Sequence, residues 1–295
     1  MNKLPPITIV VWISLCLIWG TTWIVIKIGL DDLPPISFAA LRFLLASVIL
    51  LVLLRVQGIP LPQRHEWRLL AMTGVLQFAV NYSLVFWAEQ HISSGLTAVL
   101  QATLSMFALL LAWIFLPNER ITALKISAVC LGIAGVAVIF SDQLRVQSVM
   151  AFVASVGVVI SGYAAAQAAI LVKAKGAALH PATMLFGQMV FGVPPLVVAG
   201  LMLEGNPFAF HWTWKAAAAV LYLAVLGTVV AFWLFYWLLR RVESTTATLI
   251  SVVTPLIAVV VGWLVLDERL PPQTALGGLL IIASIALIAL RRKAS

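Results

Sequence analysis

Long apolar segments fill most of this chain, and short charged or Pro/Gly-rich stretches separate them. Each segment is close to the length of about 17 to 25 residues that an apolar helix needs to cross a bilayer. A backbone exposed to lipid must satisfy its own hydrogen bonds, so these segments are expected to be helices. The predicted helices cover residues 7–30, 35–54, 68–88, 93–116, 123–140, 147–172, 181–203, 216–239, 245–266 and 273–290.

The composition argues against a soluble domain. Apolar residues make up 63% of the 295 positions, charged residues make up 9%, and the mean hydropathy is +1.12. A soluble domain needs far more polar surface to stay in water. The prediction is therefore an all-α integral membrane protein with ten transmembrane helices, in which little length remains for soluble domains.

Basic residues are unevenly distributed between the two sets of alternating loops. With the N-terminus in the cytoplasm, that side holds thirteen lysines and arginines and the opposite side holds three. This asymmetry follows the positive-inside rule, so both termini are predicted to be cytoplasmic and the location to be a plasma membrane, such as a bacterial inner membrane. The net charge of +8 then reflects topology, and no basic patch with interleaved aromatics indicates a nucleic-acid partner. The residues on the first side are Lys3, Arg55, Arg64, Arg68, Arg120, Lys125, Lys173, Lys175, Arg240, Arg241, Arg291, Arg292 and Lys293, and those on the second are Arg145, Lys215 and Arg269.

The two halves of the chain are similar to each other. When the sequence is shifted by 149 positions, Glu119-Arg120 at the end of the fourth helix meets Glu268-Arg269 at the end of the ninth. An odd number of helices per half forces the halves into opposite orientations. The sequence therefore predicts two inverted five-helix repeats, residues 1–142 and 143–295, around a central cavity, an arrangement that suits alternating access.

Several motifs carry a resemblance to a known family. They are Trp19-Gly20-Thr21-Thr22-Trp23 with Lys27, Pro35 with Arg42-Phe43, the two Glu-Arg helix ends, and Pro255. With these motifs the chain resembles the drug/metabolite transporter superfamily, specifically its ten-span EamA-like exporters, over nearly its whole length. Within that group it is most similar to amino-acid exporters, including those for aromatic amino acids. The resemblance implies a cavity lined by helices 1 to 4 and 6 to 9, with helices 5 and 10 peripheral.

The chain departs from the family at one position. The family often has a proline in the middle of both the fourth and the ninth helix, but here Met106 stands opposite Pro255. A gate that needs two symmetrical kinks is therefore not supported. Pro255 remains a candidate gating residue because its ring removes a backbone hydrogen bond. It either frees a carbonyl for a contact or forms a static kink that a neighbouring helix satisfies.

Two predicted helices carry polar side chains along one face. In the fourth helix these are Ser94, Thr97, Gln101 and Ser105, and in the ninth they are Thr248, Ser251 and Thr254. Such faces either line a pore or hold helices together. Gln101 is the stronger candidate for the pore because it is bulky and lies near the predicted middle of the membrane.

Several aromatic side chains lie deeper than an interfacial belt would place them. Tyr82, beside Asn81, and Tyr163, one turn before Gln167, can each offer a ring face and a hydroxyl to an amphipathic solute. Tryptophans nearer the helix ends are more typical of interfacial anchors. The candidate substrate-binding residues are Trp19, Thr22, Phe78, Asn81, Tyr82, Gln101, Ser105, Tyr163, Gln167, Trp233 and Thr254.

Two basic residues inside predicted helices are candidates for a gating or charge role, because charge within a membrane is costly and functional by default. Lys27 lies near the outer end of its helix and can extend to the interface. Arg42 follows Pro35 by seven residues, as Gln188 follows Pro181, and lies about 10 Å into its helix. It can pair with backbone carbonyls or bind a substrate carboxylate, and the sequence leaves both open.

The sequence does not indicate an enzyme. No Asp or Glu lies near the middle of a predicted helix, Glu89 sits at a helix end, and the four histidines fall in loops or at helix ends. The sequence therefore predicts no buried carboxylate relay, no catalytic residue, no metal, no cofactor and no ATP-binding loop.

The leading hypothesis is a transporter that exports amino acids, with aromatic or hydrophobic side chains preferred, and related small metabolites by alternating access. Its partners are then a small-molecule substrate and the lipid bilayer, and the oligomeric state stays open. One alternative is export of drugs or other metabolites, where a cationic cargo would favour a carboxylate in the middle of the membrane. A membrane protein without transport is a further alternative.

Overall fold

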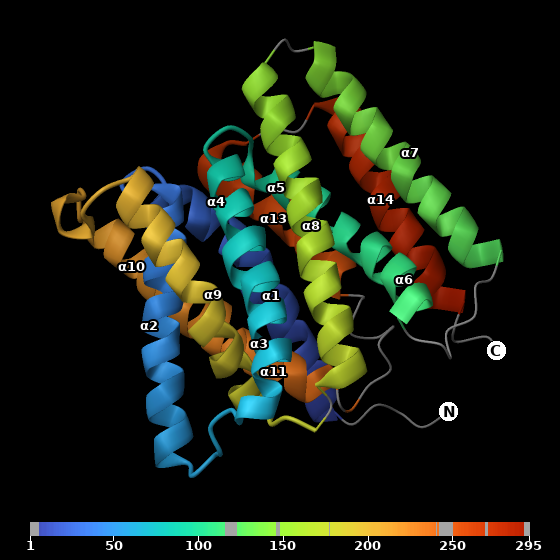
Figure 1. The fold of residues 1–295 in the computed structure, drawn as a ribbon. Helices are drawn as coiled ribbons and strands as arrows, with labels where there is room; N and C mark the ends of the chain where they lie inside the picture. The colour runs from blue at the N-terminus through green and yellow to red at the C-terminus, as the bar shows by residue number, and fades with distance from the viewer. Residues whose placement is uncertain are drawn as a thin grey trace.

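The computed structural model describes residues 6–115, 123–145, 148–176, 178–239, 241, 250–268 and 271–291. All regular elements in these ranges are helical, and they form ten segments that closely follow the predicted helices (Figure 1). The prediction of ten helices is confirmed. Among the positions singled out above, those that lie outside the described residues are Lys3, Glu119-Arg120, Arg240, Thr248, Arg269, Arg292 and Lys293.

The first five segments belong to the first half of the chain. They are α1 (Pro6–Gly29), α2 (Pro35–Val56), a third built from η1 (Arg64–Glu66), α3 (Trp67–Gly74), η2 (Val75–Asn81) and α4 (Tyr82–Glu89), a fourth built from α5 (Ser94–Gln101) and α6 (Thr103–Phe115), and α7 (Ala123–Arg145). The other five segments belong to the second half. They are α8 (Val149–Lys175), α9 (Pro181–Leu203), an eighth built from α10 (Trp214–Ala224), η4 (Val225–Val230) and α11 (Ala231–Leu239), α13 (Ile250–Leu266) and α14 (Pro272–Arg291).

Length and composition identify the helices as membrane-spanning. Within the described residues, seven helices are long and apolar enough to cross a membrane, and three shorter apolar helices accompany them. Large apolar side chains such as Val10, Leu44 and Val198 are about half exposed on the surface of the bundle. Such a surface suits lipid as the surrounding solvent. The chain is therefore an all-helical, multi-pass membrane protein.

The third and eighth segments each contain π-helical turns. η2 begins at Val75 and η4 begins at Val225, 150 positions later, which is close to the offset of the sequence repeat. The uninterrupted helices predicted over 68–88 and 216–239 miss these turns. π-Helical turns are rare and are frequent at functional sites, so their presence at matching places marks these two segments for attention.

The fourth segment is interrupted at Ala102 although it has no proline. α5 ends at Gln101 and α6 begins at Thr103. The Thr103 hydroxyl donates a hydrogen bond to the Leu100 carbonyl at 2.7 Å, and side-chain bonds of this kind bend helices. The fourth helix is therefore interrupted even though it lacks a proline like Pro255 of the ninth.

The fifth and tenth segments lie side by side at one edge of the bundle, away from α2 and α10 (Figure 1). A methyl group at Gly135 of α7 would lie 2.6 Å from the carbonyl oxygen of Gly277 in α14. Small residues are needed where two helix backbones come this close. The peripheral place of α7 and α14 is what the family resemblance implies.

Two glutamates of the second half cap helices of the first half at the same end of the bundle. Glu204, after α9, accepts hydrogen bonds from the backbone N–H groups of Ile36 and Ser37 at 2.9 and 2.6 Å. Glu268, after α13, accepts from the backbone N–H of Ser94 at 3.0 Å and from its hydroxyl at 2.6 Å. A carboxylate at a helix N-terminus satisfies unpaired donors and interacts favourably with the helix dipole. The two caps therefore fasten the halves together at this end.

Replacing Glu268 by alanine is expected to destabilise the protein by about 1 to 2 kcal/mol, because the start of α5 loses its cap. The measurement is thermal unfolding of purified protein in detergent. Asp31→Ala, which removes an exposed carboxylate at the same end, is the matched control and should leave the unfolding temperature unchanged. Equal unfolding temperatures for Glu268→Ala and the wild type would contradict the stabilising role of this cap.

Candidate functional site

A buried guanidinium group lies where α2 meets the π-helical segment η4. Arg42 is 1% exposed. Its Nε donates to the Thr228 hydroxyl at 2.9 Å, and its Nη2 donates to the Gly227 carbonyl at 3.1 Å. The Nη1 atom is buried and makes no hydrogen bond of normal geometry with a described residue, although the Tyr82 hydroxyl lies close enough to the guanidinium group to interact with it. The structure thus shows pairing with a backbone carbonyl and leaves one guanidinium nitrogen for a further acceptor.

Aromatic rings surround this guanidinium group. The Arg42 Cζ lies 4.8 Å from the ring centroid of Phe43, 4.9 Å from that of Tyr82 and 6.0 Å from that of Phe86. Rings at these distances attract a cation through their electron-rich faces. They partly replace the hydration that the buried charge has lost.

The same rings continue into a larger aromatic cluster, which consists of Phe43, Phe78, Tyr82, Phe232 and Trp19. The Phe78 centroid lies 4.9 Å from Phe43, 6.2 Å from Tyr82 and 5.7 Å from Phe232. Phe232 in turn lies 5.5 Å from Trp19. Side chains from the first, second, third and eighth segments therefore form one continuous apolar wall beside the charge.

Thr22 also lies at this site. A methyl group at Gly227 would be 3.0 Å from the Thr22 Cγ2 and 3.3 Å from the Arg42 Nη2, so the three residues adjoin. The Thr22 hydroxyl donates to the Trp19 carbonyl at 2.8 Å. Thr22 therefore turns its methyl group toward Gly227 and keeps its hydroxyl within its own helix.

A chain of amide and hydroxyl groups lies beside Tyr82. The Gln101 Nε2 donates to the Asn81 Oδ1 at 3.0 Å, and the Gln101 Oε1 accepts from the Ser161 hydroxyl at 2.7 Å. Gln101 is the last residue of α5, so this chain joins the third, fourth and sixth segments at the interruption of the fourth. Ser161 is absent from the sequence-based candidates because nothing in the α8 sequence distinguishes it from a packing serine.

The residue of the second half that corresponds to Arg42 is also hydrogen-bonded to the eighth segment. Gln188, which corresponds to Arg42 in the repeat, accepts a hydrogen bond from the Tyr236 hydroxyl at 3.0 Å. Tyr236 lies on α11, while the partners of Arg42 lie on η4. The second and seventh segments are therefore both tied to the eighth by a polar side chain.

Lys27 and Glu89 meet at the end of the bundle that carries the two caps. The Lys27 Nζ donates to the backbone carbonyls of Glu89 and Ile92. Glu89 is 0% exposed, and neither carboxyl oxygen has a hydrogen-bond partner among the described residues. The sequence places Glu89 at a helix end and predicts no buried carboxylate relay; Glu89 does end α4, but the structure shows that its side chain is fully buried there. The segments α8, α2 and α5 pack against that helix, and Lys27 is bound to the backbone on both sides of the turn.

Two of the aromatic candidates, Tyr163 and Trp233, contact rings outside the aromatic cluster. Tyr163 on α8 is 46% exposed and meets Phe107 edge-on, with ring centroids 5.6 Å apart. Trp233 on α11 packs edge-on against His180, which caps α9, at 6.1 Å. The hydrophobic pattern could not indicate which side of the helix these rings would occupy.

The remaining candidates lie on helices of both halves. Thr254 and Pro255 are buried in α13, which packs along α1. Ser105 on α6 and Gln167 on α8 are half-buried. These four residues stay predicted candidates.

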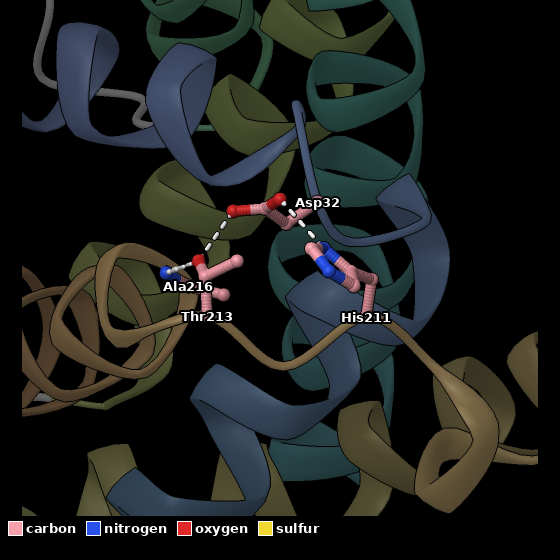
Figure 2. Close-up of polar contacts among 4 residues, drawn as sticks. All are labelled: Asp32, His211, Thr213 and Ala216. Carbon is pink, nitrogen blue, oxygen red and sulfur yellow. Dashed lines mark hydrogen bonds and ion pairs between the residues drawn. The ribbon is translucent and has the colours of Figure 1, made fainter.

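A second polar cluster joins the loop after α1 to the start of α10 (Figure 2). The Asp32 carboxylate accepts from the Thr213 hydroxyl at 2.5 Å and lies 3.2 Å from the His211 Nδ1. Thr213 is the N-cap of α10, and its hydroxyl oxygen accepts from the backbone N–H of Ala216 at 3.1 Å. The hydrogen bond from Thr213, followed by the one with His211, lowers the pKa of Asp32. This cluster is a third link between the two halves at the same end.

The lowered pKa of Asp32 predicts a pH-dependent contribution to stability. The ionised carboxylate stabilises the fold at pH values above its ordinary pKa, and this contribution is lost as the pH falls through the lowered pKa. Asp32→Asn is therefore expected to lower the unfolding temperature at about pH 7, with a difference that shrinks below about pH 4. The measurement is thermal unfolding over a pH series, with Asp31→Asn as control. A difference that persists unchanged into acid would contradict the assignment.

The groups at this site are suited to binding. Within the described part of the chain, no group of three or more His, Cys, Asp or Glu side chains could hold a metal. A guanidinium group, ring faces and a satisfied amide chain can orient a solute that carries both an anionic and an apolar part.

Comparison with known sequences gives matches over nearly the whole chain. Residues 6–141 and 152–290 each match the EamA-like transporter family. The uncharacterized transporter YoaV of Bacillus subtilis (strain 168) is 27% identical, covering 92% of this chain and 93% of its own length. The uncharacterized inner membrane transporter YedA of Escherichia coli (strain K12) is 29% identical, covering 94% and 89%. The probable amino-acid metabolite efflux pump of Escherichia coli (strain K12) is 26% identical, covering 91% and 90%.

Comparison with solved structures gives the same architecture. One crystal structure covers 96% of this chain and 98% of its own, with a TM-score of 0.70 at 14% sequence identity. At this level of identity the likeness shows the fold alone.

Proposed function

Since this chain belongs to the EamA-like transporter family, we propose that its substrates are amino acids with aromatic or bulky apolar side chains, together with related small metabolites, and that it exports them. Membership of the family makes it a membrane transporter of a small molecule and not an enzyme. What we propose is the substrate, the direction of transport and the mechanism of alternating access.

The observation that carries the proposal is the buried Arg42 with its surrounding rings. Its Nη1 makes no hydrogen bond of normal geometry with a described residue, while Nε and Nη2 are fixed by Thr228 and Gly227. A guanidinium group held in this way offers a preorganised donor to a carboxylate. The aromatic cluster beside it supplies an apolar surface for a side chain, and the relative named as an amino-acid metabolite efflux pump adds support.

Alternating access is proposed because the chain consists of two family repeats with an odd number of helices each. In such repeats, the halves can exchange conformations around a shared site, and no ATP-binding part is needed. The caps of Glu204 and Glu268 and the Asp32 cluster would then hold one end of the bundle closed in this conformation. We place this end outside the cell and both termini in the cytoplasm, which reporter fusions to each terminus would test.

Flux measurements in proteoliposomes test the proposed substrate. Purified protein should move phenylalanine, tryptophan or leucine faster than protein-free liposomes, and each proteinogenic amino acid should be assayed separately. A protein that moves none of them above the background of empty liposomes would contradict the proposal.

One observation favours the alternative of a different cargo. A cationic drug or metabolite would need an acidic partner, and Glu89 is a buried carboxyl group in the same half of the chain as Arg42, with which it interacts electrostatically. The same flux assay with cationic compounds discriminates the two, because amino-acid export predicts that they are poor substrates.

A further inference from the structure

The buried carboxyl group of Glu89 lacks the partners that a buried carboxylate needs. Glu89 is the last residue of α4 and is 0% exposed. Neither of its carboxyl oxygens accepts a hydrogen bond from a described residue. An ionised carboxylate in such surroundings is strongly destabilised unless it is paired and hydrogen-bonded, whereas the neutral acid is tolerated.

The charges around Glu89 do not provide that pairing. Lys27 on α1, Arg42 on α2 and Glu268 after α13 interact with it electrostatically. The Lys27 ammonium is bound to the backbone carbonyls of Glu89 and Ile92, and Arg42 is bound to η4. Glu268 is a second negative charge near Glu89, and it is bound to the start of α5.

The other elements packed against α4 add little charge. The α5 sequence and the first part of α8, residues 149–162, contain no titratable side chain. In and directly after the third segment, Tyr82 faces Arg42 and His91 is exposed in the turn. No neighbouring group therefore compensates for a negative charge on Glu89 by a hydrogen bond.

Water would compensate that charge if this end of the bundle opened. The Glu204 and Glu268 caps join the two halves at this end, and the Lys27 bonds join α1 to the turn after α4. A conformation in which water reaches Glu89 favours the carboxylate, and the closed conformation favours the acid. Proton binding and closure are then linked, so each shifts the other.

We propose that Glu89 is a proton-binding site that takes up a proton from water when this end of the transporter closes and returns it when the end opens. The O–H bond forms on the Glu89 carboxyl and breaks to water, and no other reactant is needed. The proposal rests on the alternating access proposed above, but not on the identity of the substrate. Closure is accordingly favoured at low pH and disfavoured as the pH rises.

Cysteine accessibility in detergent solution tests this linkage without a substrate. In a Cys130→Ser background, Ile92→Cys places a thiol at the buried Ile92, and Gln90→Cys places a thiol at an exposed position of the same turn. Both are labelled with a hydrophilic maleimide between about pH 5 and pH 9, the range over which buried glutamates can titrate. The ratio of the two labelling rates removes the pH dependence of the thiol itself.

With Glu89 present, the labelling rate of Ile92→Cys divided by that of Gln90→Cys should rise with pH. The rise can reach about tenfold per pH unit, the limit for one linked proton. With Glu89→Gln, which imitates the protonated acid, this ratio should stay low and constant, and Asp31→Asn should behave like the wild type. Glu89→Met serves as a second neutral variant if the glutamine variant does not fold. A ratio independent of pH with Glu89 present, or an unchanged pH dependence in the neutral variants, would overturn the proposal. Either result leaves the flux test of amino-acid export unaffected.

Discussion

Replacing Arg42 by glutamine is expected to reduce amino-acid flux by about tenfold to a hundredfold. A hydrogen bond to a charged group contributes about 1.5 to 3 kcal/mol, and each 1.4 kcal/mol changes an equilibrium constant about tenfold. Glutamine can keep one bond toward Thr228 or Gly227 but offers no positive charge to a carboxylate. The measurement is initial flux in proteoliposomes at equal protein content.

Two further variants separate binding from folding. Arg55→Gln removes an exposed charge from the same helix and should leave flux unchanged. Arg42→Lys keeps the charge but lacks the planar guanidinium group, which can donate to Thr228, Gly227 and a further acceptor at once. Its flux should therefore lie between that of the wild type and that of Arg42→Gln. Unfolding temperatures show whether each variant is intact. A folded Arg42→Gln protein with wild-type flux would remove Arg42 from the binding site.

Replacing Gly74 by alanine is expected to destabilise the protein by about 3 kcal/mol, the upper part of the usual range for overpacking. Gly74 ends α3, where the third segment crosses α9 with its backbone in contact. A methyl group there would lie 2.1 Å from the carbonyl oxygen of Gln188. Because the obstacle is backbone, the two helices must move apart, which would also disturb the bond between Gln188 and Tyr236. The measurement is the unfolding temperature in detergent.

Gly157 on α8 is the matched control for this substitution. A methyl group at Gly157 would meet the Trp87 ring at 3.6 Å and the Leu84 Cδ2 at 3.8 Å, both ordinary contact distances. Gly157→Ala should therefore keep the wild-type unfolding temperature. If Gly74→Ala also kept it, the close crossing of the third segment and α9 would be wrong.

The length and spacing of the apolar segments were enough to predict the ten helices. Pro35 and Pro181 marked the starts of α2 and α9, because proline is favoured in the first turn of a helix. Arg42 was identifiable as well, since an arginine seven residues inside a span is costly to leave without a function. These signals are local and depend on a few residues each.

Features that depend on contacts between distant segments could not be predicted in the same way. Glu89 ends a helix in sequence, and its burial follows from the packing of other segments around that helix end. Ser161 became part of the site only because α8 places it beside Gln101. The π-helical turns at η2 and η4 leave no mark in the hydrophobic pattern, because they alter one turn of an otherwise apolar helix.

Recognition of a substrate carboxylate by Arg42 is the central claim, and counterflow with matched compounds tests it most directly. Proteoliposomes loaded with phenylalanine should accumulate labelled phenylalanine, and external phenylalanine should compete with the label. Phenylethylamine, which keeps the ring and the amine but lacks the carboxylate, should not compete. Competition by phenylethylamine as strong as that by phenylalanine would contradict the claim.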